Sequence, residues 1–423
     1  MELKIENFGL IKEANIKLNG GTILCGVNSM GKSTVGKIVF SLIKAMYKYE
    51  EELGENKFTK IKPLVDELYY ESRKYYGRIN NSYFPPDIFR YLEKLNDNND
   101  WEEYFNTLKK NISNDGFKNK AEKILNQIIK EITHEEQKSD KIKNALRKIF
   151  YSEFSNEGIK NKNCKICFKD NKSVFDIFFN DNNFETKIEN EKDFGLIDAT
   201  LIDTPMILNF SKVIEFSQSI FEIDSKNPER ILKILNRPDI MHHYKDLISK
   251  LTIDAPIEND YSREIQNITG YKLVYDSKKH NFLIESKKSE DKFNIINAAS
   301  GIRAFGILER LLSLGIINEN NLVIIDEPES HLHPEWQLKY VNLITKLIDK
   351  NIKFLISTHS PYIIEAFQVY GEENKIKNKL DFYYAEENKN NVLFKNVTKN
   401  IEKIYEKFAA PYKELEFLKI DND

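Results

Sequence analysis

The chain has few of the features that mark secreted or membrane-spanning proteins. It contains three cysteines among 423 residues, too few for the disulfide framework of a secreted scaffold. No apolar run approaches the roughly 18 residues that would cross a bilayer. The first six residues alternate like a strand and lack the apolar core of a signal peptide. We therefore expect a soluble cytoplasmic protein without a membrane partner.

A large net charge is also missing. The chain has 63 basic and 66 acidic side chains, a formal net charge of -3 and a sequence pI of about 6.3. This balance disfavours a surface coated with positive charge for nonspecific nucleic-acid binding, although it leaves a local basic patch open. The composition, 41% hydrophobic and 30% charged, is that of a globular chain rather than a disordered one.

Short apolar runs separated by turn residues are present at both ends of the chain. Residues 3–8, 14–18 and 22–25 alternate or cluster as strands do, and a helix is expected from about residue 32 to 43. Residues 50–154 have helical periodicity, and residues 164–188 read as a small β meander. The two apolar stripes of the helical region are Ile61, Leu64, Val65, Leu68 and Tyr69, and Ile124, Leu125, Ile128, Ile129 and Ile132.

Strands and helices alternate in the later part of the chain. Strands are expected at 199–203, 271–275, 281–285, 293–296, 322–325 and 353–356, and helices at 302–314, 335–348 and 361–367. Such alternation predicts an α/β fold with a mixed, largely parallel sheet covered by helices. We divide the chain into a head, residues 1–48 and 197–398, a mainly helical insert with the meander, residues 49–196, and a helical tail, residues 399–423.

A glycine-rich loop lies between the third strand and the first helix. Residues 26–33 read Gly-Val-Asn-Ser-Met-Gly-Lys-Ser, which matches G-x-x-x-x-G-K-[ST]. Glycines let the backbone wrap a phosphate, and the helix N-terminus directs N–H groups at the anion. We expect ATP, with Lys32 at the β- and γ-phosphates and the Ser33 hydroxyl on Mg²⁺; a chance match is the alternative. The residues expected to contact the nucleotide here are Gly26, Asn28, Ser29, Gly31, Lys32, Ser33 and Thr34.

Two carboxylates follow the apolar strand 322–325. Open parallel sheets bind ligands at the edge where their strands end. Asp326 is therefore expected to coordinate Mg²⁺ through water, and Glu327 to polarise the attacking water. The alternative is an acidic loop of the kind that can follow any core strand.

Two further motifs begin near the same edge. Thr358-His359 follows the strand 353–356, so His359 would contact the γ-phosphate or hold the water. Ser300-Gly301 opens a helix, where N–H groups favour an anion. Serine is also among the commonest helix N-caps, so this motif alone does not identify an anion site.

The order of these four motifs resembles the ABC-type ATPases. The stretch from Asp326 to Pro334 is similar to their soluble branch, which includes the overcoming-lysogenization-defect (OLD) group, the RecF and SMC-like DNA-repair ATPases, and the ATPases of the Septu and PARIS antiphage systems. The resemblance implies an ABC-type ATPase head that forms a homodimer or higher homo-oligomer. Two heads would sandwich two ATPs, with Ser300 and Gly301 of one chain completing the site of the other.

The chain also departs from the family pattern. Its signature reads Ala-Ala-Ser-Gly-Ile-Arg instead of Leu-Ser-Gly-Gly-Gln, and no residue is assigned to the family's glutamine loop. Asp203-Thr204-Pro205 ends a strand in the corresponding region.

The resemblance implies ATP hydrolysis, with Glu327 as base, Lys32 and Mg²⁺ as charge stabilisers and His359 as positioning group. We expect a sensor or scaffold of an antiphage defence system. About sixty residues follow His359, too few for a further domain of about 100 residues, so the controlled effector, a nuclease, would be a separate protein. The alternative is a DNA repair or maintenance ATPase that clamps DNA; a transporter subunit fits less well.

Other candidate groups have a structural interpretation as well. We expect Cys164 and Cys167 to be buried in a strand rather than to form half of a zinc hook. His331 and His333 belong to the family motif rather than to a metal pair. The sequence Met-His-His-Tyr at 241–244 is expected on an ordinary helix surface, and the lysine-rich stretch 109–148 on a solvated helical face, with DNA contact left open.

Overall fold

The computed structural model describes residues 1–50, 61, 64–71, 98–112, 115–133, 137–154, 163–170, 173–180, 183–189, 195–215, 240–254, 256–289, 291–389 and 391–408. The chain divides into two compact units. The head comprises Met1–Lys48 and Leu146–Asp423, and the insert comprises Tyr49–Ala145.

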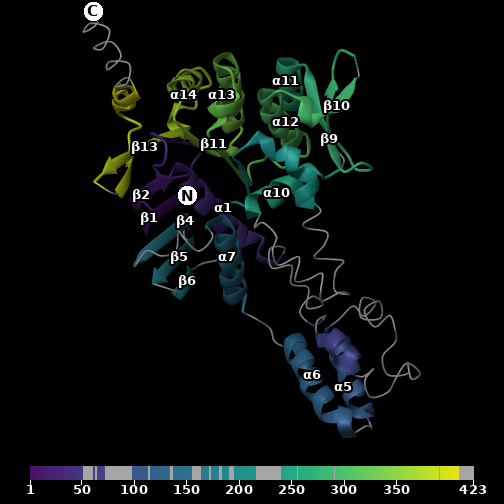
Figure 1. The fold of residues 1–423 in the computed structure, drawn as a ribbon. Helices are drawn as coiled ribbons and strands as arrows, with labels where there is room; N and C mark the ends of the chain where they lie inside the picture. The colour runs from purple at the N-terminus through teal and green to yellow at the C-terminus, as the bar shows by residue number, and fades with distance from the viewer. Residues whose placement is uncertain are drawn as a thin grey trace, which may run out of the picture. The chain divides into compact units, whose positions relative to one another are not determined.

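A mixed sheet forms the centre of the head (Figure 1). Among the described residues it has eleven strands in the order β6-β5-β4-β1-β2-β14-β13-β3-β12-β11-β7. From β13 to β7 all neighbours are parallel, whereas β1 with β2, β13 with β14, and β4 through β6 pair antiparallel. The α/β class with a mixed sheet is thereby confirmed. The strands are β1 (Glu2–Phe8), β2 (Ile11–Lys17), β3 (Gly21–Cys25), β4 (Cys164–Asp170), β5 (Ser173–Asn180), β6 (Asn183–Glu189), β7 (Asp198–Ile202), β11 (Asn321–Asp326), β12 (Lys353–Thr358), β13 (Leu380–Asn388) and β14 (Asn391–Asn396).

Helices cover both faces of the parallel strands. Ile23, Val323 and Ile356 point into one core with the helices α12 to α14, which stand in a row in Figure 1. Because strand side chains alternate between faces, Leu24 and Ile324 face the other way, where α1 packs on β7, β11 and β12. The head helices are α1 (Lys32–Tyr47), α10 (His242–Leu251), α11 (Asp260–Thr269), α12 (Ser300–Ser313), α13 (Pro334–Asp349) and α14 (Pro361–Glu373), with the short 3-10 turns η1 (Pro205–Phe210), η2 (Ile295–Asn297), η3 (Pro328–His331) and η4 (Lys377–Lys379).

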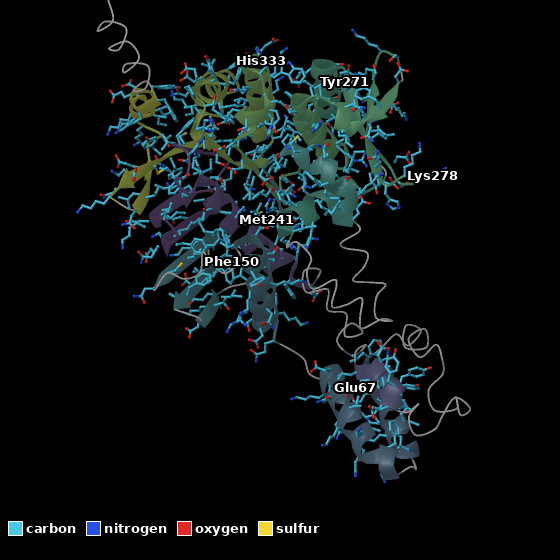
Figure 2. The ribbon with its side chains drawn as sticks, in the orientation of Figure 1. Glu67, Phe150, Met241, Tyr271, Lys278 and His333 are labelled. Atoms are coloured by element: carbon cyan, nitrogen blue, oxygen red, sulfur yellow. The ribbon has the colours of Figure 1, made fainter. Side chains whose placement is uncertain are left out.

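A second, three-stranded sheet packs on α12. It consists of β8 (Tyr271–Asp276), β9 (Asn281–Ser286) and β10 (Lys292–Asn294). Figure 2 shows Tyr271 at the start of β8 and Lys278 in the turn that joins β8 to β9. Among the described residues, no helix is both long and apolar enough to cross a membrane.

The insert has a core of its own. Its described helical segments are residues 64–71, α5 (Asn98–Asn111) and α6 (Asp115–Thr133), and α7 (Lys138–Phe154) begins in the insert and ends in the head. Residues from both apolar stripes predicted in the sequence are buried together. This cluster contains Ile61, Val65, Leu68, Trp101, Phe105, Leu108, Ile112, Phe117, Ala121, Ile124, Leu125 and Ile128.

The meander differs from its predicted place. Its first strand, β4, pairs with β1, with Ile166 opposite Ile5, so that β4 to β6 extend the head sheet and the insert ends at Ala145. The reason is burial: Phe179 on β5 packs on Phe8 and on Phe150 of α7, with ring centroids 6.1 and 5.7 Å apart. A pairing between strands this distant in sequence leaves no mark in the local pattern.

Two other segments extend the comparison with the sequence. The hairpin β13–β14 has no counterpart among the predicted strands, and its parallel pairing with β3 places it beside the glycine-rich loop. Residues 402–408 are helical, as expected for the tail. The rest of the tail lies outside the described residues.

Candidate functional site

The glycine-rich loop joins β3 to α1 at the edge where the parallel strands end. Gly26 and Gly31 have φ angles of 152° and 76°, values that L side chains rarely adopt. A Cβ on Gly26 would also lie 3.0 Å from the Cβ of Ala385 on β13. Gly31 is the N-cap of α1 and has no side chain to cap the helix, and the first turn of α1 has no acidic residue. The N–H groups of this first turn therefore remain available to an anion. Asn28 and Ser29 are exposed, and Thr34 is half-buried on α1.

The Lys32 amine is folded back over this loop. It donates hydrogen bonds to the carbonyl oxygens of Gly26 (2.9 Å) and Val27 (2.8 Å) and lies 3.8 Å from Oε1 of Glu327. Burial lowers the pKa of Lys32, while the carboxylates nearby act in the opposite direction. Among the described residues, the partners of this buried ammonium are two carbonyls and a distant carboxylate, which makes it a ready partner for phosphate oxygens.

Asp326 ends β11 beside two hydroxyl groups. The Ser357 hydroxyl on the neighbouring strand β12 donates a hydrogen bond to its Oδ1. Burial raises the pKa of Asp326, and hydrogen bonds from Ser357 and Ser33 oppose that shift. A buried carboxylate and a serine hydroxyl at the start of α1 are the oxygen ligands that Mg²⁺ accepts alongside waters and phosphate oxygens. Ser33 and Asp326 therefore fit the predicted magnesium site.

Glu327 follows with a strained backbone. Its φ of 45° and ψ of 57° fall in the left-handed region, which costs a non-glycine residue of order 1 kcal/mol or more. Its backbone N–H donates to the Ser357 carbonyl at 2.9 Å. The turn places Oε1 3.8 Å from the Lys32 amine and 3.4 Å from Nδ1 of His359. The structure thus brings the three predicted catalytic side chains together.

Glu329 is the residue of this site that the sequence did not single out. Its Oε1 accepts hydrogen bonds from the Thr358 hydroxyl (2.7 Å) and the His359 backbone N–H (2.6 Å). The same oxygen lies 3.2 Å from Nδ1 of His359, although that nitrogen makes no hydrogen bond of regular geometry among the described residues. Burial raises the pKa of Glu329. Glu329 therefore fixes the strand end that carries His359, a role that only the folded positions of η3 and β12 reveal.

Ser300 and Gly301, at the start of α12, pack against η3 and the start of α13. Ser300 begins α12 and donates its hydroxyl to the carbonyl of His331 at 3.3 Å. A Cβ on Gly301 would lie 3.0 Å from the Trp336 ring, so glycine permits close packing on the start of α13. Among the described residues, no hydrogen bond or ion pair joins Ser300 to the phosphate loop of its own chain. The N-cap Ala299 has no capping side chain, and the helix start is half-exposed.

The expectation for residues 241–244 is wrong for His243. This histidine is fully buried, and its ring lies between Glu153 and Asp203. The sequence held a signal, because His243 and Leu247 are four residues apart and share one face of α10. Charged partners on two distant elements, rather than solvent, satisfy its nitrogens.

The cysteine pair takes strand positions. Cys164 is opposite Phe179 and Cys167 opposite Asp176 in the pairing of β4 with β5. Residues three apart on a strand point to opposite faces, and burial raises the pKa of both thiols to about 12. Within the described part of the chain, no group of three or more His, Cys, Asp or Glu residues is arranged to hold a metal ion.

Comparison with known proteins agrees with this geometry. A family model described as an AAA ATPase domain matches residues 1–364. The chain belongs to this AAA ATPase domain family. The match includes every predicted site residue, from the phosphate loop to His359.

Several curated relatives of this AAA ATPase resemble parts of the chain. A "Retron Vc95 probable ATPase" from Vibrio cholerae is 35% identical over 107 residues, 23% of this chain and 20% of that protein. The "Septu protein PtuA" of Bacillus thuringiensis is 42% identical over 45 residues, 11% of each. "Endonuclease GajA" of Bacillus cereus is 26% identical over 405 residues, 84% of this chain and 54% of that protein. The chain thus spans about half the length of these relatives or less.

Proposed function

We propose that this AAA ATPase domain protein binds ATP with Mg²⁺ and hydrolyses it. One observation carries the proposal: the Glu327 carboxylate lies between the Lys32 amine (3.8 Å) and the His359 ring (3.4 Å), directly after Asp326. All of these groups lie at the carboxyl edge of β3, β11 and β12, where open α/β sheets bind their ligands.

The binding step follows from the loop and the amine. N–H groups of the loop 26–31 and of the first turn of α1 would surround the phosphates. Lys32 would exchange its two carbonyl partners for the β- and γ-phosphate oxygens. Ser33 and Asp326 would hold Mg²⁺, which neutralises phosphate charge when bound.

The hydrolytic step needs a base and a group that orients water. Glu327 would accept the proton of the attacking water. His359 would orient this water or contact the γ-phosphate through its ring, while Glu329 holds the His359 backbone N–H at the strand end. Since phosphoryl transfer depends mostly on positioning and electrostatics, this fixed arrangement supports hydrolysis.

We also propose that ATP acts by closing two heads into a homodimer or higher homo-oligomer. Ser300 and Gly301 would approach the phosphates of the partner, because the start of α12 is uncapped by a side chain and half-exposed. ATP binding would then control assembly.

For the cellular role, we propose a cytoplasmic sensor or scaffold of an antiphage defence system that controls a separate nuclease. Two relatives support this role by their names. One is a Septu protein, and Septu is among the antiphage systems whose ATPases the motifs resemble; the other is an endonuclease. Co-purification of the chain with the products of its genomic neighbours tests this role. Recovery of a specific nuclease in stoichiometric amount is expected, whereas DNA-stimulated turnover without any such partner would favour a DNA-clamping ATPase.

The enzymatic proposal has a direct test. Phosphate release from ATP is measured for the purified chain with and without Mg²⁺, alongside Lys32→Ala and the matched control Lys339→Ala. Lys339 is a lysine on α13 whose side chain is exposed and paired with Glu335 at 2.7 Å. We expect Mg²⁺-dependent turnover in wild type and in the control, and none in Lys32→Ala. Equal turnover in Lys32→Ala would overturn the assignment.

A further inference from the structure

A buried chain of three ionisable side chains runs from the end of β7 to α7. His243 on α10 lies in the middle, with Nδ1 2.8 Å from Glu153 Oε2 and Nε2 3.2 Å from Asp203 Oδ2. The His243 backbone N–H also donates to Glu153 Oε1 at 2.9 Å. The side chains of His243 and Glu153 are completely buried, and that of Asp203 is 20% exposed. We call these three residues the relay.

Contacts within the relay favour the charged form of each member. Burial opposes charge on every member, but hydrogen bonds and mutual attraction prevail. They raise the pKa of His243 and lower the pKa of Glu153 and Asp203. Both carboxylates contact the same His243 ring, and Glu153 Oε2 also lies 3.8 Å from the Lys37 amine. We expect a displacement of one carboxylate to reach the other through this ring.

Asp203 brings the relay to the nucleotide site. Ile202 pairs with Ile325 in the parallel register of β7 and β11, so Asp203 and Asp326 leave adjacent strands at the same edge. The Asp203 charge contributes to the raised pKa of Asp326, although burial of Asp326 is the larger cause. Asp203 Oδ2 accepts from the Tyr244 hydroxyl at 2.7 Å, whereas Oδ1 is buried without a hydrogen-bond partner in the described structure. One oxygen of this carboxylate is thus fixed and the other is left to accept from a ligand.

Glu153 brings the relay to the connection with the insert. It lies in the last turn of α7, the helix by which the chain returns from the insert to the head. In the same turn, the Ser152 hydroxyl donates to the carbonyl of Ile240 at 3.3 Å, just before α10. Figure 2 marks Phe150 on this helix and Met241 at the start of α10. The last turn of α7 is therefore bonded to α10 through Glu153 and Ser152, and it is His243 of α10 that also contacts Asp203.

We propose that Asp203 is a positioning residue of the nucleotide site, accepting a hydrogen bond from a water on the Mg²⁺ held by Ser33 and Asp326, and that the relay transmits site occupancy to α7. The proposal rests on the MgATP binding proposed above. It predicts that Asp203 acts on magnesium affinity more than on nucleotide affinity. It also predicts that α7 responds to MgATP only while the relay is intact.

The first arm of the test measures binding. A fluorescent, non-hydrolysable ATP analogue is titrated with and without Mg²⁺ into wild type, Asp203→Asn, Glu153→Gln and the control Asp260→Asn, whose carboxylate is 95% exposed. In both relay variants we expect the magnesium affinity of the nucleotide complex to fall about tenfold, the lower end for lost outer-shell partners. The affinity for the analogue without Mg²⁺ should change less than about twofold. Thermal melts check that each variant is folded.

The second arm measures the response of α7. Hydrogen exchange of peptides covering residues 146–154 is followed with and without saturating analogue and Mg²⁺. Protection in wild type and in Asp260→Asn, lost in Asp203→Asn although the analogue is bound, is the expected result. This measurement does not depend on catalysis. It also does not require Glu153→Gln, which changes a fully buried side chain, to fold.

The outcomes separate the two proposals. If wild type does not bind the analogue, the proposed function fails and the relay inference fails with it. If wild type binds it and Asp203→Asn has the same magnesium affinity, the positioning role is refuted. If wild type binds it and residues 146–154 exchange at the same rate with and without ligand, transmission to α7 is refuted.

Discussion

Replacing Asp198 with alanine removes one of two counterions from a pair of buried lysines. Asp198 Oδ1 lies 2.7 Å from the Lys44 amine and Oδ2 2.8 Å from the Lys250 amine. Asp246 contacts the same two amines at 2.5 and 2.9 Å. The four side chains are at most 17% exposed, and they join α1, β7 and α10 behind the phosphate loop. The cluster thus sets the position of the helix whose first turn would bind phosphate.

The expected loss can be worked from these contacts. Breaking a buried ion pair by removing one partner costs about 3–5 kcal/mol. Asp246 still pairs with both lysines in Asp198→Ala, and Lys250 also donates to the Ala199 carbonyl at 2.8 Å. The free energy of unfolding should therefore fall by an amount near the lower limit, about 3 kcal/mol.

The effect has a defined pH dependence. Burial of Asp198 opposes its charge, but Lys250 and Lys44 outweigh burial and lower its pKa in the folded state. A carboxylate with a lowered folded pKa contributes stability that is complete above its unfolded pKa, about 3.9, and is lost as pH falls through the folded value. The difference between wild type and Asp198→Ala should therefore be constant near neutral pH and decrease below about pH 4.

Urea unfolding of the head tests this prediction. The chain has two tryptophans; Trp101 is buried in the insert and Trp336 packs in the head, so Trp336 fluorescence in a Trp101→Phe background reports on the head. Asp260→Ala removes an exposed carboxylate 3.3 Å from Arg263 and should change nothing measurable. A loss below about 0.5 kcal/mol for Asp198→Ala at pH 7, the size of an ordinary surface effect, would refute the reasoning.

Three further predictions concern the site. Lys32→Ala should abolish nucleotide binding in a fluorescence titration, because no other described amine is held by the loop carbonyls; retained tight binding would remove Lys32 from the site. Glu329→Ala leaves the Thr358 hydroxyl and the His359 N–H without their acceptor, at about 1–3 kcal/mol for each buried donor. It should lower kcat more than it raises KM, and Glu329→Gln, which keeps an acceptor, should recover most activity. Ser300→Arg protein mixed with Lys32→Ala protein should recover about one working site per dimer if sites are shared; inactivity of verified mixed dimers would contradict this.

Local patterns predicted most of the elements that form the site. The strands β3, β11 and β12 are short apolar runs ended by glycine or polar residues, and their parallel order places Asp326 and His359 at one edge. The resemblance to ABC-type ATPases implied that Lys32 and Glu327 act in one site, and their side chains lie 3.8 Å apart.

Features that depend on distant pairing could not be read from such patterns. The position of β4 beside β1 joins residues more than 150 apart, with Ile5 opposite Ile166. The contact of Glu153 with His243 likewise depends on how α7 and α10 pack. Glu329 lies within a recognised motif, but its bonds to Thr358 and His359 depend on the approach of η3 to β12.

Glu327→Gln tests the central claim most directly. The substitution keeps the side-chain shape but removes the base, so steady-state hydrolysis should fall about a hundredfold or more. ATP binding should persist, and unhydrolysed ATP should accumulate in closed dimers detected by light scattering and by nucleotide analysis of the dimer peak. Turnover by Glu327→Gln at the wild-type rate would contradict the account, because it would remove Glu327 from the hydrolytic step.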